Sequence, residues 1–410
     1  MLRNYFKIAI AVLKRRKFFT FISLFGISLT LTILIVATAY MDKLLSPDYP
    51  DYKRDRSLYI TGIEYQNSKE GWINRSDVSY YFLDHYVSKL KNVYKIAISS
   101  GPKSSNAYVN NKKLVIAYKY TNAAYWDVLE YNFLEGKPFS QREIDNAELI
   151  TVISKETKEA YFGNSGPVVG KYISADNINY RVIGVVDNVS ETLNHLAGDM
   201  YLPYTLSRDA KSTELMGAFN GILLAKSKAE LPLMKNEFNQ MVKRLPLPSK
   251  EFDRLYCNAD SFFDNTTRSI AGDSTKTATS KVVSAAVILL LLFLLLPTIN
   301  LVNINITRIL ERSSEIGVRK AFGASSKTLV LQFLVENLIL TFFGALIGLC
   351  LSSLVIYVIN EASLISNMQL KINFTVLFYS LIACIFFGLI SGVYPAWLMS
   401  RLNVVKALKG

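Results

Sequence analysis

The 410 residues of this chain are half hydrophobic and 19% charged, and they carry a formal net charge of +13. This balance is typical of a membrane protein with a sizeable water-soluble part, and it argues against a chain that lies wholly in the bilayer. The positive charge does not indicate nucleic acid, because nearly all of it lies in three short segments beside apolar runs.

The N-terminal segment, residues 1–17, carries six basic side chains and no acidic one. Its apolar residues alternate with these charges, which predicts either an amphipathic helix on the inner face of the membrane or a simple basic orientation tag. Residues 18–41 form an apolar run longer than the ~20 residues that span a bilayer as a helix. Because this run also exceeds the apolar region of a signal peptide, we expect an uncleaved membrane anchor.

Residues 42–281 are close to neutral and are predicted to form a mixed α/β domain outside the membrane, with two subdomains as an alternative. "LVIAYKYTNAAYWDVL" indicates a strand, a turn and a short helix, and "ELITVISKETKEAYFG" indicates a strand and a helix capped by Ser154 and ended by Gly163. Further strands are expected in "YRVIGVVDNV" and "MYLPY". The polar stretch "ADSFFDNTTRSIAGDSTKTATSK" is expected to lead into the second apolar run as a helix.

Residues with catalytic or metal-binding spacing are scarce in this domain. His85 and His195 are far apart and have no neighbouring cysteines, so no zinc motif is present. "SGPVVGKY" carries Ser165 and Tyr172 where a phosphate-binding loop needs Gly and then Ser or Thr. Cys257 has no second cysteine in the domain for a disulfide. We therefore expect a binding or structural domain with no catalytic residue, metal or cofactor.

The C-terminal part alternates apolar runs with short loops. Three runs are expected to span the membrane, the loop after the first of them is basic, and so is the tail at 400–410. The predicted spans are residues 282–303, 328–359 and 374–399, separated by loops 304–327 and 360–373. Basic short loops stay in the cytoplasm, so both termini and loop 304–327 are placed there. The fold class is an α-helical bundle of four transmembrane helices with the α/β domain between the first two.

Small residues recur every four positions in the last two runs. Gly344 and Gly348 lie in the third predicted span, and Gly388 and Gly392 lie in the fourth. Such faces let helices approach closely in lipid. The sequence leaves open whether the contact is within this chain or at the seam of a dimer.

Polar residues also occur inside the apolar runs. Pro297, Asn300 and Asn303 are expected to bend the second span and to bridge helices near its inner end. The third run is longer than a membrane needs, so we expect Glu336 at the cytosolic interface, as part of the region that couples the loop to the bundle. A buried functional carboxylate is the alternative.

Loop 304–327 carries more order than an ordinary basic loop. Residues 308–322 are predicted to be helical, with Glu315 four residues before Arg319, the favourable order for an ion pair. Gly323 can end this helix, and Ser325 or Ser326 can cap the next. One face carries small or apolar residues three or four positions apart: Leu310, Ser314, Gly317, Ala321 and Ala324. This spacing favours a helix on which a partner docks, although a simple positive-inside loop would explain the arginines.

The motif "RSSEIGVRKAFGAS" in this loop resembles the signature loop of the MacB/FtsX-like permease family, the membrane subunits of a class of ABC transporters. "YPAWLMSRLNVVKALK" is similar to the family's closing motif. In the predicted outer domain, "YWDVLEYNFLEGKPFS", "VISKETKEAYFG", "VGKYIS" and "YRVIGVVDNVS" resemble its periplasmic core. The resemblance covers nearly the whole chain.

The resemblance implies a permease of the inner membrane that forms a homodimer or a related heterodimer and binds two cytoplasmic ATP-binding subunits. ATP hydrolysis is then expected in that separate subunit, and this chain is not expected to be an enzyme. Its motion would serve efflux or extraction of a substrate, with an extracytoplasmic adaptor or substrate, lipid and no nucleic acid as partners. A non-transporting mechanotransmitter or sensor is the alternative. The positions assigned to ATPase coupling are Glu311, Arg312, Glu315, Gly317, Arg319, Lys320, Ala321 and Gly323.

Overall fold

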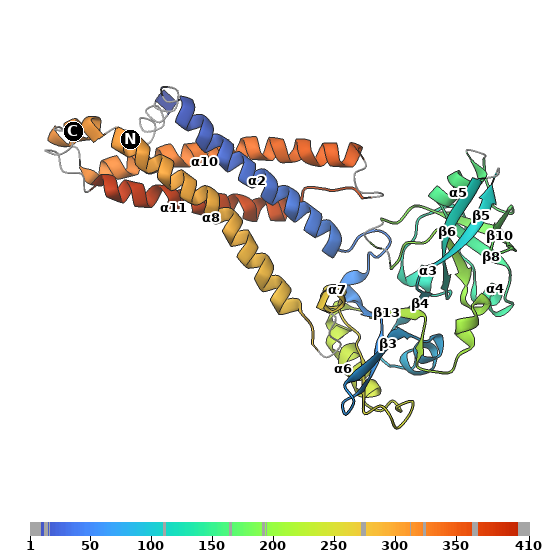
Figure 1. Cartoon of the computed structure of the whole chain (residues 1–410). Helices are drawn as coiled ribbons and strands as arrows, with labels where there is room; N and C mark the ends of the chain where they lie inside the picture. Colours follow the sequence, from blue (N-terminus) through green and yellow to red (C-terminus); the bar gives the residue numbers. More distant parts are fainter. Residues whose placement is uncertain are drawn as a thin grey trace. The chain divides into compact units, whose positions relative to one another are not determined.

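The computed structural model describes most of the chain. The described residues are 10–11, 15, 17–109, 112–163, 166–190, 193, 195–271, 276–311, 313–322, 325–362 and 368–400. They divide into two compact units (Figure 1), and each is treated by itself below. The helical unit is drawn from Met1–Leu44, Val283–Ile365 and Gln369–Gly410, and the α/β unit from Leu45–Val282 and Ser366–Met368.

The α/β unit alternates strands with short helices. Its strands are β1 (Ser57–Ile60), β2 (Ile63–Asn67), β3 (Trp72–Val78), β4 (Lys95–Ser100), β5 (Lys103–Val109), β6 (Lys112–Thr121), β7 (Phe133–Gly136), β8 (Ile150–Ser154), β9 (Tyr172–Ala175), β10 (Ile178–Val186), β11 (Met200–Pro203), β12 (Met216–Gly217), β13 (Phe219–Leu224) and β14 (Arg254–Cys257). Its α-helices are α3 (Tyr125–Val128), α4 (Gln141–Asp145), α5 (Lys155–Phe162), α6 (Leu231–Val242) and α7 (Phe262–Ala271). Shorter turns are η1 (Arg54–Arg56), the π-helix η2 (Phe82–Val87), η4 (Tyr204–Leu206), η5 (Arg208–Lys211) and η6 (Lys228–Glu230).

The strands pair in the order β14-β2-β3-β13-β4-β6-β11-β8-β10-β7, with β1, β12, β5 and β9 paired beside β13, β3, β6 and β10. Most neighbours are antiparallel, but β6 and β11 are parallel, as are β8 and β10. A parallel pair needs a long crossover, and α5 lies in the crossover from β8 to β10. The predicted mixed α/β domain is confirmed.

Local sequence explains where these elements begin and end. The Ser154 hydroxyl accepts the Thr157 backbone N–H at 3.1 Å, and Gly163 ends α5 with φ 68°, so the predicted cap and stop are confirmed. Gly136 has φ 65° at the end of β7, and a Cβ atom there would collide with the Ile183 carbonyl oxygen. Only glycine lets β7 lie this close to β10.

Side-chain alternation along the central strands builds two apolar cores. Val152 of β8 and Ile183 of β10 join a cluster with Trp126, whereas their chain neighbours Ile153 and Val182 join another. Successive strand residues point to opposite faces, so these clusters cover the two sides of this part of the sheet. A third cluster packs β1, β4 and β13 against the π-helix η2 and α6.

The helical unit contains long helices from both ends of the chain and one short helix, α9. They are α2 (Lys17–Leu45), α8 (Thr279–Glu311), α9 (Ser313–Ala321), α10 (Ser326–Glu361) and α11 (Phe374–Ser400). Of the two serines expected to cap α10, Ser325 does so, its hydroxyl accepting the Thr328 N–H at 3.2 Å. The N-terminal segment predicted as an amphipathic helix lies largely outside the described residues.

Two helices in the part of the chain that was searched, Lys17–Leu45 and Lys327–Glu361, are long and apolar enough to cross a membrane by length and composition. α8 and α11 also carry apolar stretches, which are shorter within the described residues. The fold therefore agrees with a permease, and the four predicted spans stay a prediction.

The predicted helix at 308–322 is helical at every described residue through Ala321, as the end of α8 and as α9, with Arg312 outside the described residues. The stretch before α8 differs from the single helix expected, since α7 ends at Ala271 and residues 276–278 are not helical. The sequence after Ala271, Gly-Asp-Ser, favours a turn.

Candidate functional site

α9 has an inner face and an outer face. Ile316 and Gly317 are buried, and Ile316 packs with Leu329 and Phe333 of α10. The residues on the other side are exposed and follow helical spacing, and they are called the α9 outer face: Ser314, Val318, Ala321 and Phe322. Phe322 is 89% exposed. α9 is therefore a helix attached to its own chain along one side and open along the other.

Polar side chains fasten α9 to α10 beside this apolar contact. Arg319 Nη1 donates to Gln332 Oε1 at 3.1 Å, and Gln332 Nε2 donates to Glu336 Oε1 at 3.0 Å. Gln332 and Glu336 are buried. The Gln332 amide thus lies between the Arg319 guanidinium and the Glu336 carboxylate and hydrogen bonds to both. These bonds stabilise polar groups that are buried away from water. Glu336 was expected at the cytosolic interface, and the structure buries it beside Gln332; its part in coupling stays a prediction.

The residues assigned to coupling from the sequence occupy different places. Gly317 is buried and Arg319 is turned to α10, so neither lies on the open face, whereas Ala321 does. Glu311 is exposed at the end of α8. Arg312, Gly323 and the side chains of Glu315 and Lys320 lie outside the described residues, and with them the predicted ion pair of Glu315. Sequence reasoning missed Val318 and Phe322, although an aromatic residue in a charged loop was the available signal.

A buried group of amides joins three of the long helices. Asn305 Nδ2 of α8 donates to Asn337 Oδ1 of α10 at 3.4 Å and to the Ser391 carbonyl of α11 at 3.3 Å. Asn337 Nδ2 donates to Ser391 Oγ at 3.2 Å and to the Gly388 carbonyl. Asn303, which was expected to bridge helices, is exposed, and the side chain of Asn300 lies outside the described residues. Asn305 bridges instead because it is two positions further on, on the buried side of α8.

The four glycines in the small-residue faces lie at contacts inside the helical unit. A Cβ atom at Gly344 would be 2.6 Å from Ile27 Cγ2 of α2, and one at Gly348 would be 2.9 Å from the Ser28 carbonyl oxygen. The other two face α10, since a Cβ atom at Gly388 would be 2.5 Å from Thr341 Oγ1, and one at Gly392 would be 2.8 Å from Asn337 Nδ2. These distances allow only a hydrogen at each position.

One strand of the α/β unit carries a buried lysine. Lys119 of β6 is fully buried and its Nζ donates to the His195 carbonyl. Burial lowers the pKa of the Lys119 ammonium to about 7. Among the residues searched, no group of three or more His, Cys, Asp or Glu is placed to hold a metal ion.

Comparison with known families covers both units. The MacB-like periplasmic core domain family matches residues 20–241, and the FtsX-like permease C-terminal family matches residues 287–404. These matches define a membrane permease with a MacB-like periplasmic core. The chain belongs to the MacB/FtsX-like family of ABC transporter permeases.

Curated relatives are similar at low identity. The macrolide export ATP-binding/permease protein MacB of Acinetobacter baylyi is 26% identical over 69% of this chain and 41% of its own length. The pyoverdine export ATP-binding/permease protein PvdT of Pseudomonas aeruginosa is 24% identical over 73% of this chain and 44% of its own length. MacB of Salmonella typhimurium is 23% identical over 98% of this chain and 59% of its own length. The chain thus spans about half the length of the curated relatives it matches.

Solved structures align with about half of the chain. The periplasmic region of MacB from Actinobacillus actinomycetemcomitans aligns with a TM-score of 0.37 and 16% identity, covering 53% of this chain and 94% of that chain. A permease domain from Porphyromonas gingivalis aligns with a TM-score of 0.42 and 15% identity, covering 52% of this chain and 92% of that chain.

Proposed function

We propose that this chain is the four-span permease subunit of an ABC transporter, and that a cytoplasmic ATP-binding subunit docks on the α9 outer face. The observation that carries the proposal is the two-sided construction of α9, with an inner face fastened to α10 and an outer face left open. Two permease copies and two ATP-binding subunits would form the working assembly in the inner membrane, with both termini of the permease in the cytoplasm.

The chemistry of the outer face suits a protein partner. Phe322 and Val318 are exposed apolar side chains on an otherwise polar, charged connection. A protruding aromatic residue that enters a pocket on a partner is a common source of binding free energy in protein interfaces. A short helix that presents apolar residues at helical spacing can be received in a groove.

Contacts inside the helical unit would carry the motion onward. A displacement of α9 acts on α10 through Ile316 and through Arg319, Gln332 and Glu336. From α10 the hydrogen bonds of Asn337 reach α11 and α8. The α/β unit, which is the outer domain in this proposal, would then move for efflux or extraction of a substrate. Export is also the activity for which the macrolide and pyoverdine relatives are named.

The test replaces Phe322 by serine in the full chain and measures how much ATP-binding subunit purifies with it. Truncating a central interface residue commonly costs ~2 kcal/mol or more, which is ~30-fold in affinity, so Phe322→Ser should lose most of the bound subunit. Leu233→Ser is the matched control, because Leu233 is also an exposed leucine but belongs to α6 of the α/β unit, and it should leave the amount unchanged.

Equal recovery of the ATP-binding subunit with Phe322→Ser and with the unaltered chain would show that α9 is not the docking element. A purified unaltered chain that hydrolyses ATP alone, with no other subunit present, would overturn the proposal as a whole.

A further inference from the structure

Two connections join the α/β unit to the long helices, and they converge within that unit. The first follows α2 and includes Arg54. The second precedes α8 and contains α7. The contacts described below all lie within the α/β unit, which includes Thr279, the first residue of α8.

The first connection is fixed by one buried ion pair. Arg54 Nε is 2.9 Å from Asp51 Oδ2, and Arg54 Nη1 donates to the Ser46 carbonyl at 2.9 Å. The Tyr59 hydroxyl of β1 donates to the same Asp51 oxygen at 2.5 Å. The guanidinium and the carboxylate are both almost fully buried, so breaking the pair would leave a charge without its partner in the protein interior. The chain after α2 is thereby held to the edge of β1.

The second connection is fixed across the segment between α7 and α8. Thr279 Oγ1 donates to Asp264 Oδ1 at 2.5 Å, and the hydroxyl oxygens of Thr279 and Thr267 are 3.0 Å apart. Asp264 and Thr267 lie one turn apart on α7, so both side chains reach the hydroxyl of Thr279. The first residue of α8 is thus bonded to the middle of α7. Side-chain hydrogen bonds, and not the intervening chain alone, hold the two helices together.

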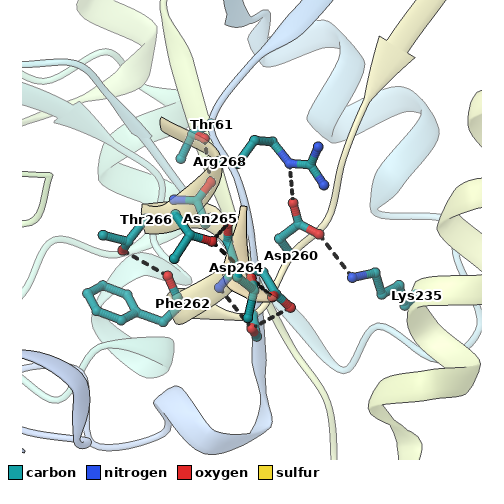
Figure 2. A network of polar contacts seen from close by, with 11 residues as sticks. Thr61, Lys235, Asp260, Phe262, Asp264, Asn265, Thr266 and Arg268 are labelled. Atoms are coloured by element: carbon teal, nitrogen blue, oxygen red, sulfur yellow. Dashed lines mark hydrogen bonds and ion pairs between the residues drawn. The ribbon is translucent and has the colours of Figure 1, made fainter. Parts of the chain in front are cut away.

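α7 is in turn bonded to the body of the α/β unit. Figure 2 shows Asp260, just before α7, accepting from Lys235 of α6 at 2.9 Å and from Arg268 of α7 at 2.7 Å. In the same view Thr61, after β1, donates to Asn265 Oδ1 at 2.6 Å. These bonds connect α7 to two other segments, so a displacement of α7 acts on both of them.

Phe262 at the start of α7 is the point where the two connections meet. The Arg54 guanidinium carbon lies 3.9 Å from the centre of the Phe262 ring, and the rings of Phe262 and Tyr59 are 5.5 Å apart. A polar pocket of about 120 Å³, lined by residues that include Asn265 and Arg268, borders α7. α7 is therefore held there by directional bonds with space beside them.

We propose that Phe262, Asp264, Thr267 and Thr279, with Arg54, form a joint (the α7 joint) through which movement of α8 reaches the α/β unit. This inference rests on the proposed function for the source of the movement. It assigns positioning residues that lie outside the family motif of loop 304–327. Both chain connections meet at the contact between Arg54 and Phe262, so a movement of either connection acts on the Phe262 ring and on α7.

The test measures how firmly α8 is held to the α/β unit, without any ATP-binding subunit. Spin labels are placed at Lys281→Cys in α8 and Tyr172→Cys in β9, both exposed, in the full chain with its native cysteines replaced, in lipid nanodiscs. Pulsed electron paramagnetic resonance then gives the distribution of the distance between them. With the joint intact the distribution should be narrow, and with Thr279→Val it should widen at least twofold.

Two control variants separate the joint from a general loss of structure. Thr279→Ser keeps the hydroxyl and should restore the narrow distribution. Thr266→Val removes a hydroxyl from the same helix, but that hydroxyl bonds to the Phe262 carbonyl within α7 at 2.9 Å, so the distribution should stay narrow. An unchanged width in Thr279→Val, or equal widening in Thr266→Val, would overturn the inference.

A second measurement links the joint to function. In the complex with the ATP-binding subunit, Thr279→Val should keep ATP hydrolysis at the level of the unaltered complex, because α9 is unaltered, and should lose the nucleotide-dependent change in the label distance. If the unaltered complex shows no such change, the proposed function fails, while the nucleotide-free widths still decide whether the joint exists. If Thr279→Val responds to nucleotide like the unaltered complex, the joint does not transmit movement.

Discussion

Lys119 shows what a single buried residue does to the α/β unit. Its ammonium is fully buried, and the hydrogen bond to the His195 carbonyl supplies no negative charge. Burial penalises the charged form, which is why the pKa of Lys119 falls from 10.5 to about 7. A lysine at this position therefore costs stability whenever it must carry its proton in the folded unit.

The pH dependence of stability follows from that shift. Between pH 7 and pH 10 the unfolded chain holds the Lys119 proton more tightly than the folded unit does, so the free energy of unfolding should rise with pH, by at most ~1.4 kcal/mol per pH unit. Lys119→Met should remove this rise. Thermal unfolding of the full chain at several pH values, followed by tryptophan fluorescence, measures it, and equal slopes in both proteins would contradict the prediction.

Close contacts between helices limit the size of the residue at some positions of α11. α11 approaches α10 where Gly388 meets Thr341, whose hydroxyl donates to the Asn337 carbonyl within α10 at 3.0 Å. A methyl group at Gly388 must displace this bonded side chain or push the helices apart. Gly26 of α2 has no such neighbour, because a Cβ atom there would meet nothing within 4 Å.

We therefore expect Gly388→Ala to destabilise the helical unit by ~1–3 kcal/mol, the usual cost of overpacking. Gly26→Ala should be neutral or slightly stabilising, because alanine favours a helix over glycine. Unfolding of the two variants in mixed micelles with increasing denaturing detergent compares them directly. Similar costs for both substitutions would mean that the glycine contact is not a constraint on packing.

The helices differ in how well their ends and buried sides can be predicted from the sequence. β8 with α5 was predictable to its cap and its stop, because Ser154 and Gly163 act within one turn of chain. The end of α7 at Ala271 was not predicted, since the polar stretch leading into α8 was expected to be one helix. On α9 the spacing of small residues did not tell which side would be buried. That depends on Leu329 and Phe333, which reach Ile316 only after the chain has turned back.

At the scale of the whole molecule, the arrangement across the membrane is the claim on which the proposed function depends. Two of the helices satisfy the length and hydropathy of a span, and the family to which the chain belongs consists of membrane permeases. The four predicted spans would put α9 and the α/β unit on opposite sides of the membrane, which is what the proposed function requires.

This arrangement predicts which residues reagents can reach from outside intact cells. A cysteine in place of Asp187, in the α/β unit, should react with a membrane-impermeant maleimide, and one in place of Ser325, the cap of α10, should react only after the cells are opened. The reverse pattern, or labelling of both in intact cells, would require a different number of spans.

Buried polar contacts between distant residues were the hardest feature to predict from the sequence. Asn300 and Asn303 were expected to bridge helices, but Asn303 is exposed and the bridging residue is Asn305, two positions beyond the predicted span. The sequence did not single out Asn305, because which side of a helix is buried depends on its neighbours. The α7 joint was equally hidden, because Arg54 and Phe262 are more than 200 residues apart in sequence and no local pattern pairs them.

The attachment of α9 to α10 has a consequence for the chain between the helices. Since Ile316 and Arg319 bind α9 to α10, we expect these two helices to move as one body. Residues inserted just before α9 would leave this attachment in place. The same residues inserted just after α9 would change the angle between α9 and α10, and with it the direction in which the α9 outer face meets its partner.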